Sequence, residues 1–179
     1  MSANLNEQSP KALTHFTSPE LILPELQSRT AASVIGELSG ALQRQGRLSD
    51  LGGFCDAVMH RELMSATSMS PGWALPHARL KGLARISFAI GRSSRPLLWL
   101  GDRGSRVHTV FLFAVPEMEA KTYLNLIASI ARLSQNAELV EKLRLAQTAG
   151  AMFQILEQVP LRQPRPASAA TLPACLEAR

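Results

Sequence analysis

The chain has 179 residues, of which 46% are hydrophobic, and this is enough for one domain with a substantial core. Its longest apolar runs, such as 110–115, are far shorter than the roughly 20 residues that cross a bilayer. Residues 1–10 are polar rather than signal-like, so we expect a cytoplasmic protein with no membrane insertion. The net charge of +5 is spread along the chain without interleaved aromatic residues, which argues against nucleic-acid binding.

The two cysteines, Cys55 and Cys175, are too far apart for a zinc-ligand spacing and do not form a disulfide framework. No metal or cofactor is therefore expected. Residues 1–18 lack periodicity, and residues 160–179 contain four prolines among alanine and serine. We predict an N-terminal tail over 1–18, one domain over 19–159 and a flexible tail over 160–179.

Helical periodicity comes first along the chain. Residues 30–45 place apolar side chains on one face and are followed by Gly46, and Asp50 can cap a second helix that runs to about Met64. The serine- and threonine-rich segment 65–72 is predicted to be a loop.

Strand patterns occupy the middle of the sequence. Residues 73–75 suit only a brief strand with His77 at its exit, and short apolar runs follow at 86–90 and 97–100. Residues 110–115 are almost continuously apolar, which is typical of a central strand covered on both faces.

The last part of the domain returns to helical spacing, over 119–134 and then in apolar sets at 139–143 and 152–156. Helices before and after a group of strands predict an α/β sandwich. A mixed sheet is favoured because some connections between strands are too short for parallel crossovers.

Histidines are the candidate reactive residues. His15 lies in the predicted tail, His108 opens the apolar strand and His60 lies on a helix, so a structural or incidental role is favoured for these three. His77 differs because Pro76 fixes the backbone before it and a polar loop lies beside it.

A neutral imidazole can attack a phosphoryl group near neutral pH and hold it as a labile phosphoramidate. Nearby donors must then stabilise the phosphoryl oxygens, and Arg61, Thr67, Ser68 and the start of the 119–134 helix are available. Spacing alone leaves this hypothesis less favoured than a structural role for His77.

Several ordered motifs resemble a known family. Arg61-Glu62, Ala66-Thr67 and the run 72–78, which reads GWALPHA, resemble the RE…ST…G-x-A-[IL]-P-H-[AG] signature of the fructose/mannitol-type EIIA domains of bacterial phosphotransferase systems. The run 110–116 resembles the family's core strand, 121–124 with Leu133 its following helix, and 139–146 its closing stretch. The resemblance covers about residues 20–158.

The resemblance implies an EIIA type-2-like sandwich with a mixed sheet of about five strands flanked by helices. It also implies that His77 accepts a phosphoryl group from an HPr-like phosphocarrier protein, with Arg61 and the Thr67 hydroxyl at the site. The family's second active-site histidine is replaced by Tyr123, and Trp73 is bulkier than the usual aliphatic residue.

The function implied is that of a phosphotransferase component with a transient phosphohistidine. A regulatory protein of the nitrogen branch, which acts on target proteins, is the favoured interpretation. The alternatives are an EIIA subunit of fructose/mannitol-type uptake that passes the group to an EIIB domain, and a degenerate protein-binding module.

Overall fold

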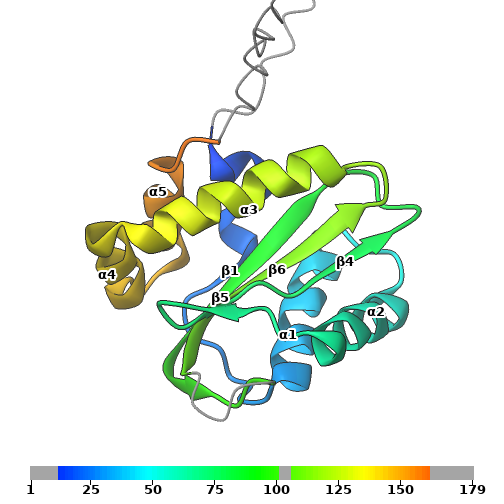
Figure 1. The fold of residues 1–179 in the computed structure, drawn as a ribbon, viewed down its shortest axis with the longest axis horizontal. Helices are drawn as coiled ribbons and strands as arrows, with labels where there is room; N and C mark the ends of the chain where they lie inside the picture. Colours follow the sequence, from blue (N-terminus) through cyan, green and yellow to red (C-terminus); the bar gives the residue numbers. More distant parts are fainter. Residues whose placement is uncertain (1–11, 101–105, 162–179) are drawn as a thin grey trace, which may run out of the picture.

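The computed structural model describes residues 12–100 and 106–161, which form one mixed sheet between two helical layers (Figure 1). The sheet has the order β1-β5-β6-β3-β2, and β4 also pairs with β6. Its strands are β1 (Ile22–Leu23), β2 (Ser68–Met69), β3 (Trp73–Ala74), β4 (His77–Leu80), β5 (Ser87–Leu97) and β6 (Val107–Pro116). Strands β1/β5, β3/β6 and β4/β6 are parallel pairs, whereas β5/β6 and β2/β3 are antiparallel. The predicted mixed α/β sandwich is confirmed, with six strands where about five were expected.

Helices cover both faces of this sheet (Figure 1). On one face lie α1 (Ala31–Arg44) and α2 (Leu51–Met64), and on the other lie α3 (Ala120–Gln135), α4 (Ala137–Leu145) and α5 (Ala149–Glu157). The two faces therefore have separate hydrophobic cores. No helix in the two described ranges is long and apolar enough to span a membrane.

Local sequence signals account for where the helices of the first layer begin. Thr30 and Ser33 cap α1 reciprocally, each side chain binding the other residue's backbone N–H. Asp50 accepts a hydrogen bond from the Gly53 N–H at the start of α2. Both helices match the predicted ranges 30–45 and 50–64.

The central strand β6 supplies both cores. Successive side chains of a strand point to opposite faces, so Phe111 and Phe113 pack against the layer of α3–α5, whereas Val110 and Leu112 pack against α1 and α2. All four side chains are fully buried. The doubly covered strand predicted over 110–115 is thus confirmed.

Residues 12–18 differ from the expected N-terminal tail. They include the 3-10 helix η1 (Leu13–Phe16), whose Leu13 and Phe16 side chains are buried in the core beside α5. The Leu13 N–H donates to the Val159 carbonyl oxygen, and Ala12 forms a β-bridge with Pro160. A four-residue 3-10 helix is too short to produce a detectable period, so pattern alone missed it. Residues 1–11 and 162–179 of the predicted tails lie outside the described residues.

The short strands also differ from the predictions. The brief strand predicted over 73–75 is present as β3, and His77, which follows it after two residues, begins a further strand, β4, that was not predicted. The expected loop 65–72 contains β2. The apolar runs at 86–90 and 97–100 were expected to be separate, but β5 continues from Ser87 to Leu97 with an irregularity after Arg92. Two-residue strands show no alternation, and their place is set by pairing: β1 pairs with β5, β3 with β6 and β2 with β3.

Candidate functional site

The backbone around His77 is fixed by the central strand. The Phe113 N–H of β6 donates to the Pro76 carbonyl oxygen at 3.0 Å, and His77 pairs in register with Phe113. Pro76 itself is buried and has a restricted φ. The His77 side chain is therefore held at a defined point of the sheet while its ring stays half-exposed.

The His77 ring is oriented by its own chain. Nδ1 lies 3.1 Å from the Leu75 carbonyl oxygen. Because a carbonyl oxygen only accepts hydrogen bonds, Nδ1 carries the hydrogen in this contact. In the neutral ring the lone pair is then on Nε2, which is the nitrogen free to act as a nucleophile or base.

The surroundings of His77 favour the neutral ring. Burial lowers its pKa below the usual 6.5, and the charges of Arg61 and Arg79 lower it further. The hydrogen bond with Leu75 and the Glu62 carboxylate oppose this decrease, but the net direction is downward. Near neutral pH the Nε2 lone pair is thus unprotonated.

Tyr123, near the start of α3, packs directly on His77. The centroids of the Tyr123 and His77 rings are 5.1 Å apart, and the angle between the ring planes is 39°. The Tyr123 ring also makes an edge-on contact with the Phe113 ring. Burial raises the pKa of Tyr123 to about 12, so the phenol remains protonated. Within the described part of the chain its hydroxyl makes no hydrogen bond, which leaves a donor available beside the imidazole.

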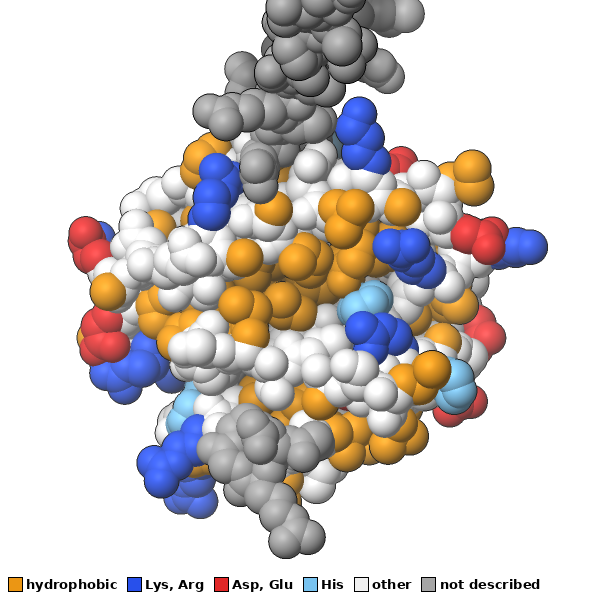
Figure 2. Space-filling model, in the orientation of Figure 1, with side chains coloured by type: hydrophobic (Ala, Val, Ile, Leu, Met, Phe, Trp, Pro, Cys, Tyr) orange, Lys and Arg blue, Asp and Glu red, His pale blue; other side chains and the backbone are white. Residues whose placement is uncertain are grey.

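Two arginines complete the exposed side of the site. Arg61 and Arg79 line a shallow depression of about 400 Å³ together with Ala57, His77 and Ala78. The Arg61 guanidinium donates to the Ser65 carbonyl oxygen at 2.8 Å, and the Arg79 guanidinium lies 5.6 Å from the centre of the Tyr123 ring. Such a cation–π contact holds a flexible cation near one place. In Figure 2 a histidine lies between basic side chains, at the margin of a hydrophobic area.

Thr67 is placed behind the site rather than on its open side. Its hydroxyl donates to Glu62 Oε2 at 2.8 Å and accepts from the Leu75 N–H at 3.1 Å. The buried Glu62 carboxylate also accepts from the Thr67 N–H and from the Trp99 indole N–H at 2.7 Å. Through Thr67 and Leu75, this network positions the segment that carries His77.

The structure therefore brings His77, Arg61 and Tyr123 together and gives Thr67 a supporting place. Sequence reasoning missed Arg79, which lies two residues after His77 and on the same open depression. A predicted strand beginning at His77 would have placed Arg79 on the same face of the sheet as His77, because side chains two residues apart in a strand point the same way. The contact between Glu62 and Trp99 had no local signal, because the two residues are far apart in the sequence.

The other candidate residues lie elsewhere. His15 and His60 are exposed, and His108 lies on β6 five residues before Phe113, the residue that pairs with His77. Cys55 is a free, half-buried thiol on α2, whereas Cys175 lies outside the described residues. Over residues 12–100 and 106–161, no group of three or more His, Cys, Asp or Glu side chains converges to hold a metal ion.

An α/β sandwich that presents an oriented histidine with a lowered pKa beside two guanidinium groups has the features of a group-transfer domain. Residues 15–159 match the family described as phosphoenolpyruvate-dependent sugar phosphotransferase system, EIIA 2. The chain belongs to this family.

Relatives of two kinds are similar to the chain. A nitrogen regulatory protein of Bradyrhizobium diazoefficiens is 29% identical over 148 residues, which cover 83% of this chain and 96% of the relative. The fructose-specific EIIABC component of Bacillus subtilis is 27% identical over 146 residues, but these span only 23% of that protein and 82% of this chain. In structure, the nitrogen regulatory protein IIA-Ntr of Neisseria meningitidis has a TM-score of 0.73 at 22% identity, covering 80% of this chain and 98% of that one.

We predict that His77 titrates below pH 6.5, because burial and the two guanidinium groups disfavour the imidazolium. The unfolded chain takes up this proton first as the pH falls, so His77 lowers the free energy of unfolding below pH 6.5. The ring resonances of His77, assigned with His77→Gln, should be followed by NMR over pH 4–8. A midpoint at or above that of the urea-unfolded protein would contradict the described environment.

Proposed function

We propose that the chain is a histidine phosphocarrier of a phosphoenolpyruvate-dependent relay and accepts a phosphoryl group on Nε2 of His77. The observation that carries this proposal is the contact between His77 Nδ1 and the Leu75 carbonyl oxygen, which directs the free lone pair to Nε2. Family membership supports the reaction class.

In the proposed step, Nε2 attacks the phosphorus atom of a phosphohistidine on an HPr-like carrier. A new P–N bond forms at His77, the donor P–N bond breaks, and the donor imidazole keeps the electron pair. Nδ1 keeps its hydrogen throughout. Arg61, Arg79 and the Tyr123 hydroxyl would bind the phosphoryl oxygens, which carry the negative charge.

A docking area for the carrier adjoins His77 in the proposed complex. Large hydrophobic side chains are exposed on the elements that bear the site: Leu63 and Met64 at the end of α2, and Met118 and Leu124 around the start of α3. Exposed apolar groups around a polar centre are typical of protein–protein contact sites.

For the role of the phosphorylated protein we propose regulation in the nitrogen branch, with target proteins bound according to phosphorylation state in the cytoplasm. Similarity along 96% of a nitrogen regulatory relative supports this choice. The alternative is sugar uptake of the fructose/mannitol type, with onward transfer to an EIIB domain, and the similarity to a fructose-specific component favours it. A degenerate binding module is a third possibility, because Tyr123 replaces the family's second histidine.

The direct test is phosphorylation of the intact chain by phosphoenolpyruvate, enzyme I and the cognate phosphocarrier. We expect an acid-labile, base-stable adduct on wild-type protein and none on His77→Ala, since no other histidine has this environment. His15→Ala and His60→Ala are the matched controls and should be labelled normally. Undiminished labelling of a folded His77→Ala protein would refute the proposal.

Arg79→Gln is predicted to slow phosphorylation of His77 by about 10- to 100-fold, because a charge-assisted contact with the phosphoryl oxygens is lost. Arg44→Gln removes the same charge from the exposed end of α1 and serves as the control. Initial rates of labelling should be compared at equal carrier concentration. Equal rates for the two variants would exclude Arg79 from the site.

Tyr123→Phe is predicted to slow labelling by about 2- to 10-fold, because it removes one neutral hydrogen-bond donor while keeping the ring contacts with His77 and Arg79. Tyr123→His should give faster or more complete transfer, since an imidazole can become cationic beside the phosphoryl group. Initial rate and final extent should be measured for the three proteins after checking that their melting curves agree. If Phe and Tyr behave alike and His brings no gain, Tyr123 only closes the pocket by packing.

A further inference from the structure

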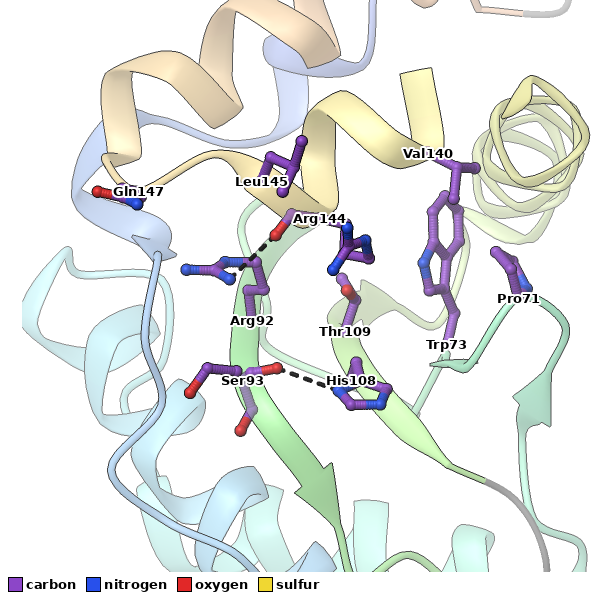
Figure 3. Close-up of a pocket in the computed structure, with 11 residues that line it drawn as sticks. Pro71, Trp73, Arg92, Ser93, His108, Thr109, Val140, Arg144, Leu145 and Gln147 are labelled. Atoms are coloured by element: carbon purple, nitrogen blue, oxygen red, sulfur yellow. Dashed lines mark hydrogen bonds between the residues drawn. The ribbon is translucent and has the colours of Figure 1, made fainter. Parts of the chain in front are cut away.

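A second cavity, of about 410 Å³, lies between the β5–β6 pair and the end of α4 (Figure 3). Arg92 on β5 pairs in register with Thr109 on β6, and both line the cavity. Thr109 lies four residues along β6 from Phe113, the partner of His77, so the two levels of the strand are roughly 13 Å apart. The cavity shares no lining residue with the depression at His77. The proposed phosphoryl transfer therefore makes no use of it.

The wall of this cavity carries an excess of positive charge. Arg92, whose side chain is only 14% exposed, lies 3.7 Å from Glu25, and the same carboxylate is 3.9 Å from Arg29. The Glu25 carboxylate is thus the shared ionic partner of two guanidinium groups, and its single negative charge cannot neutralise both. The buried Arg92 Nε has no hydrogen-bond partner among the described residues. A partly desolvated, incompletely neutralised cation attracts an anion more strongly than one in open solvent.

Arg92 is held in place, whereas Arg144 can adapt. Arg92 Nη1 donates to the Arg144 carbonyl oxygen at 3.0 Å and so ties β5 to the end of α4 (Figure 3). The Arg144 guanidinium forms a bidentate i,i+3 pair with Glu141, with Nε and Nη2 donating at 2.7 and 2.6 Å, and both partners are more than half exposed. Because this pair is open to solvent, the Arg144 guanidinium can exchange Glu141 for the more highly charged phosphate group.

The rest of the lining has an apolar part and a polar part. Trp73, Pro71 and Val140 lie together on one side of the cavity, whereas Leu145 lies beside Arg144 (Figure 3). On β6, His108 Nδ1 donates to the Ser93 carbonyl oxygen at 3.2 Å, which fixes its ring. Concave sites with apolar walls and a few convergent polar groups are typical of small-molecule binding.

We propose that this cavity binds a small phosphate monoester, with the phosphate between Arg92 and Arg144 and an apolar group against Trp73, Pro71 and Val140. A phosphate offers three oxygens to two guanidinium groups on different elements, whereas a carboxylate offers two. The juxtaposition of a fixed arginine, an adaptable arginine and an apolar wall selects the class of ligand. The proposal is independent of the reaction at His77.

The test uses phenyl phosphate, inorganic phosphate and benzoate as probes, titrated into the full chain while the His108 ring and Trp73 indole resonances are followed by NMR. We expect saturable shifts of both residues, with phenyl phosphate binding about fivefold or more tightly than inorganic phosphate because its ring contacts the apolar wall. Benzoate should bind more weakly than phenyl phosphate. Benzoate as the tighter ligand, or no saturable shift up to about 20 mM phenyl phosphate, would overturn the proposal.

Variants then assign the binding to this cavity. Arg144→Gln should raise the dissociation constant for phenyl phosphate about tenfold. Lys142→Gln, which breaks a similar exposed pair with Glu138 on the same helix but does not line the cavity, should leave it unchanged. His77→Ala should bind as wild type does. Equal effects of Arg144→Gln and Lys142→Gln, or loss of binding in His77→Ala, would contradict a phosphate site here.

Discussion

The buried carboxylate of Glu62 accepts hydrogen bonds from the Thr67 N–H, the Thr67 hydroxyl and the Trp99 indole N–H. A charge in the interior is stable only when such donors surround it, and removing one donor leaves the rest under-satisfied. These three bonds join α2, the segment after it and the chain beyond β5. Since Thr67 in turn receives the Leu75 N–H, the position of the His77 backbone depends on this carboxylate.

Charge and burial act together at His77. Burial first, and then the charges of Arg61 and Arg79, lower the pKa of His77, and the same guanidinium groups would face the negative charge of the phosphoryl group in the proposed product. Tyr123 adds packing and a protonated hydroxyl without adding charge. In the proposed reaction the same two arginines would act before and after transfer, because their positive charge disfavours the imidazolium of His77 and attracts the oxygens of a bound phosphoryl group.

The sequence was informative where a pattern was long or a motif was dense. Caps at Thr30 and Asp50 marked the starts of α1 and α2, and the apolar run of β6 indicated a central strand. The motif around Pro76 led to His77 and Arg61. Several elements of two to four residues, among them η1 and β2, were missed because they exist through tertiary contacts rather than periodicity, although the brief strand β3 was predicted. Likewise, Glu62 and Trp99 are 37 residues apart, so only the fold shows their contact.

The β-bridge between Ala12 and Pro160 brings the two ends of the described domain side by side, next to η1 and α5. These ends lie at the side of β1, and β5 and β6 separate that strand from β4 and His77. A domain whose ends meet at one point can be inserted into a loop of another protein or circularly permuted with little change to its core. The architecture is thus suited to reuse as a module, because neighbouring chain segments would attach away from His77.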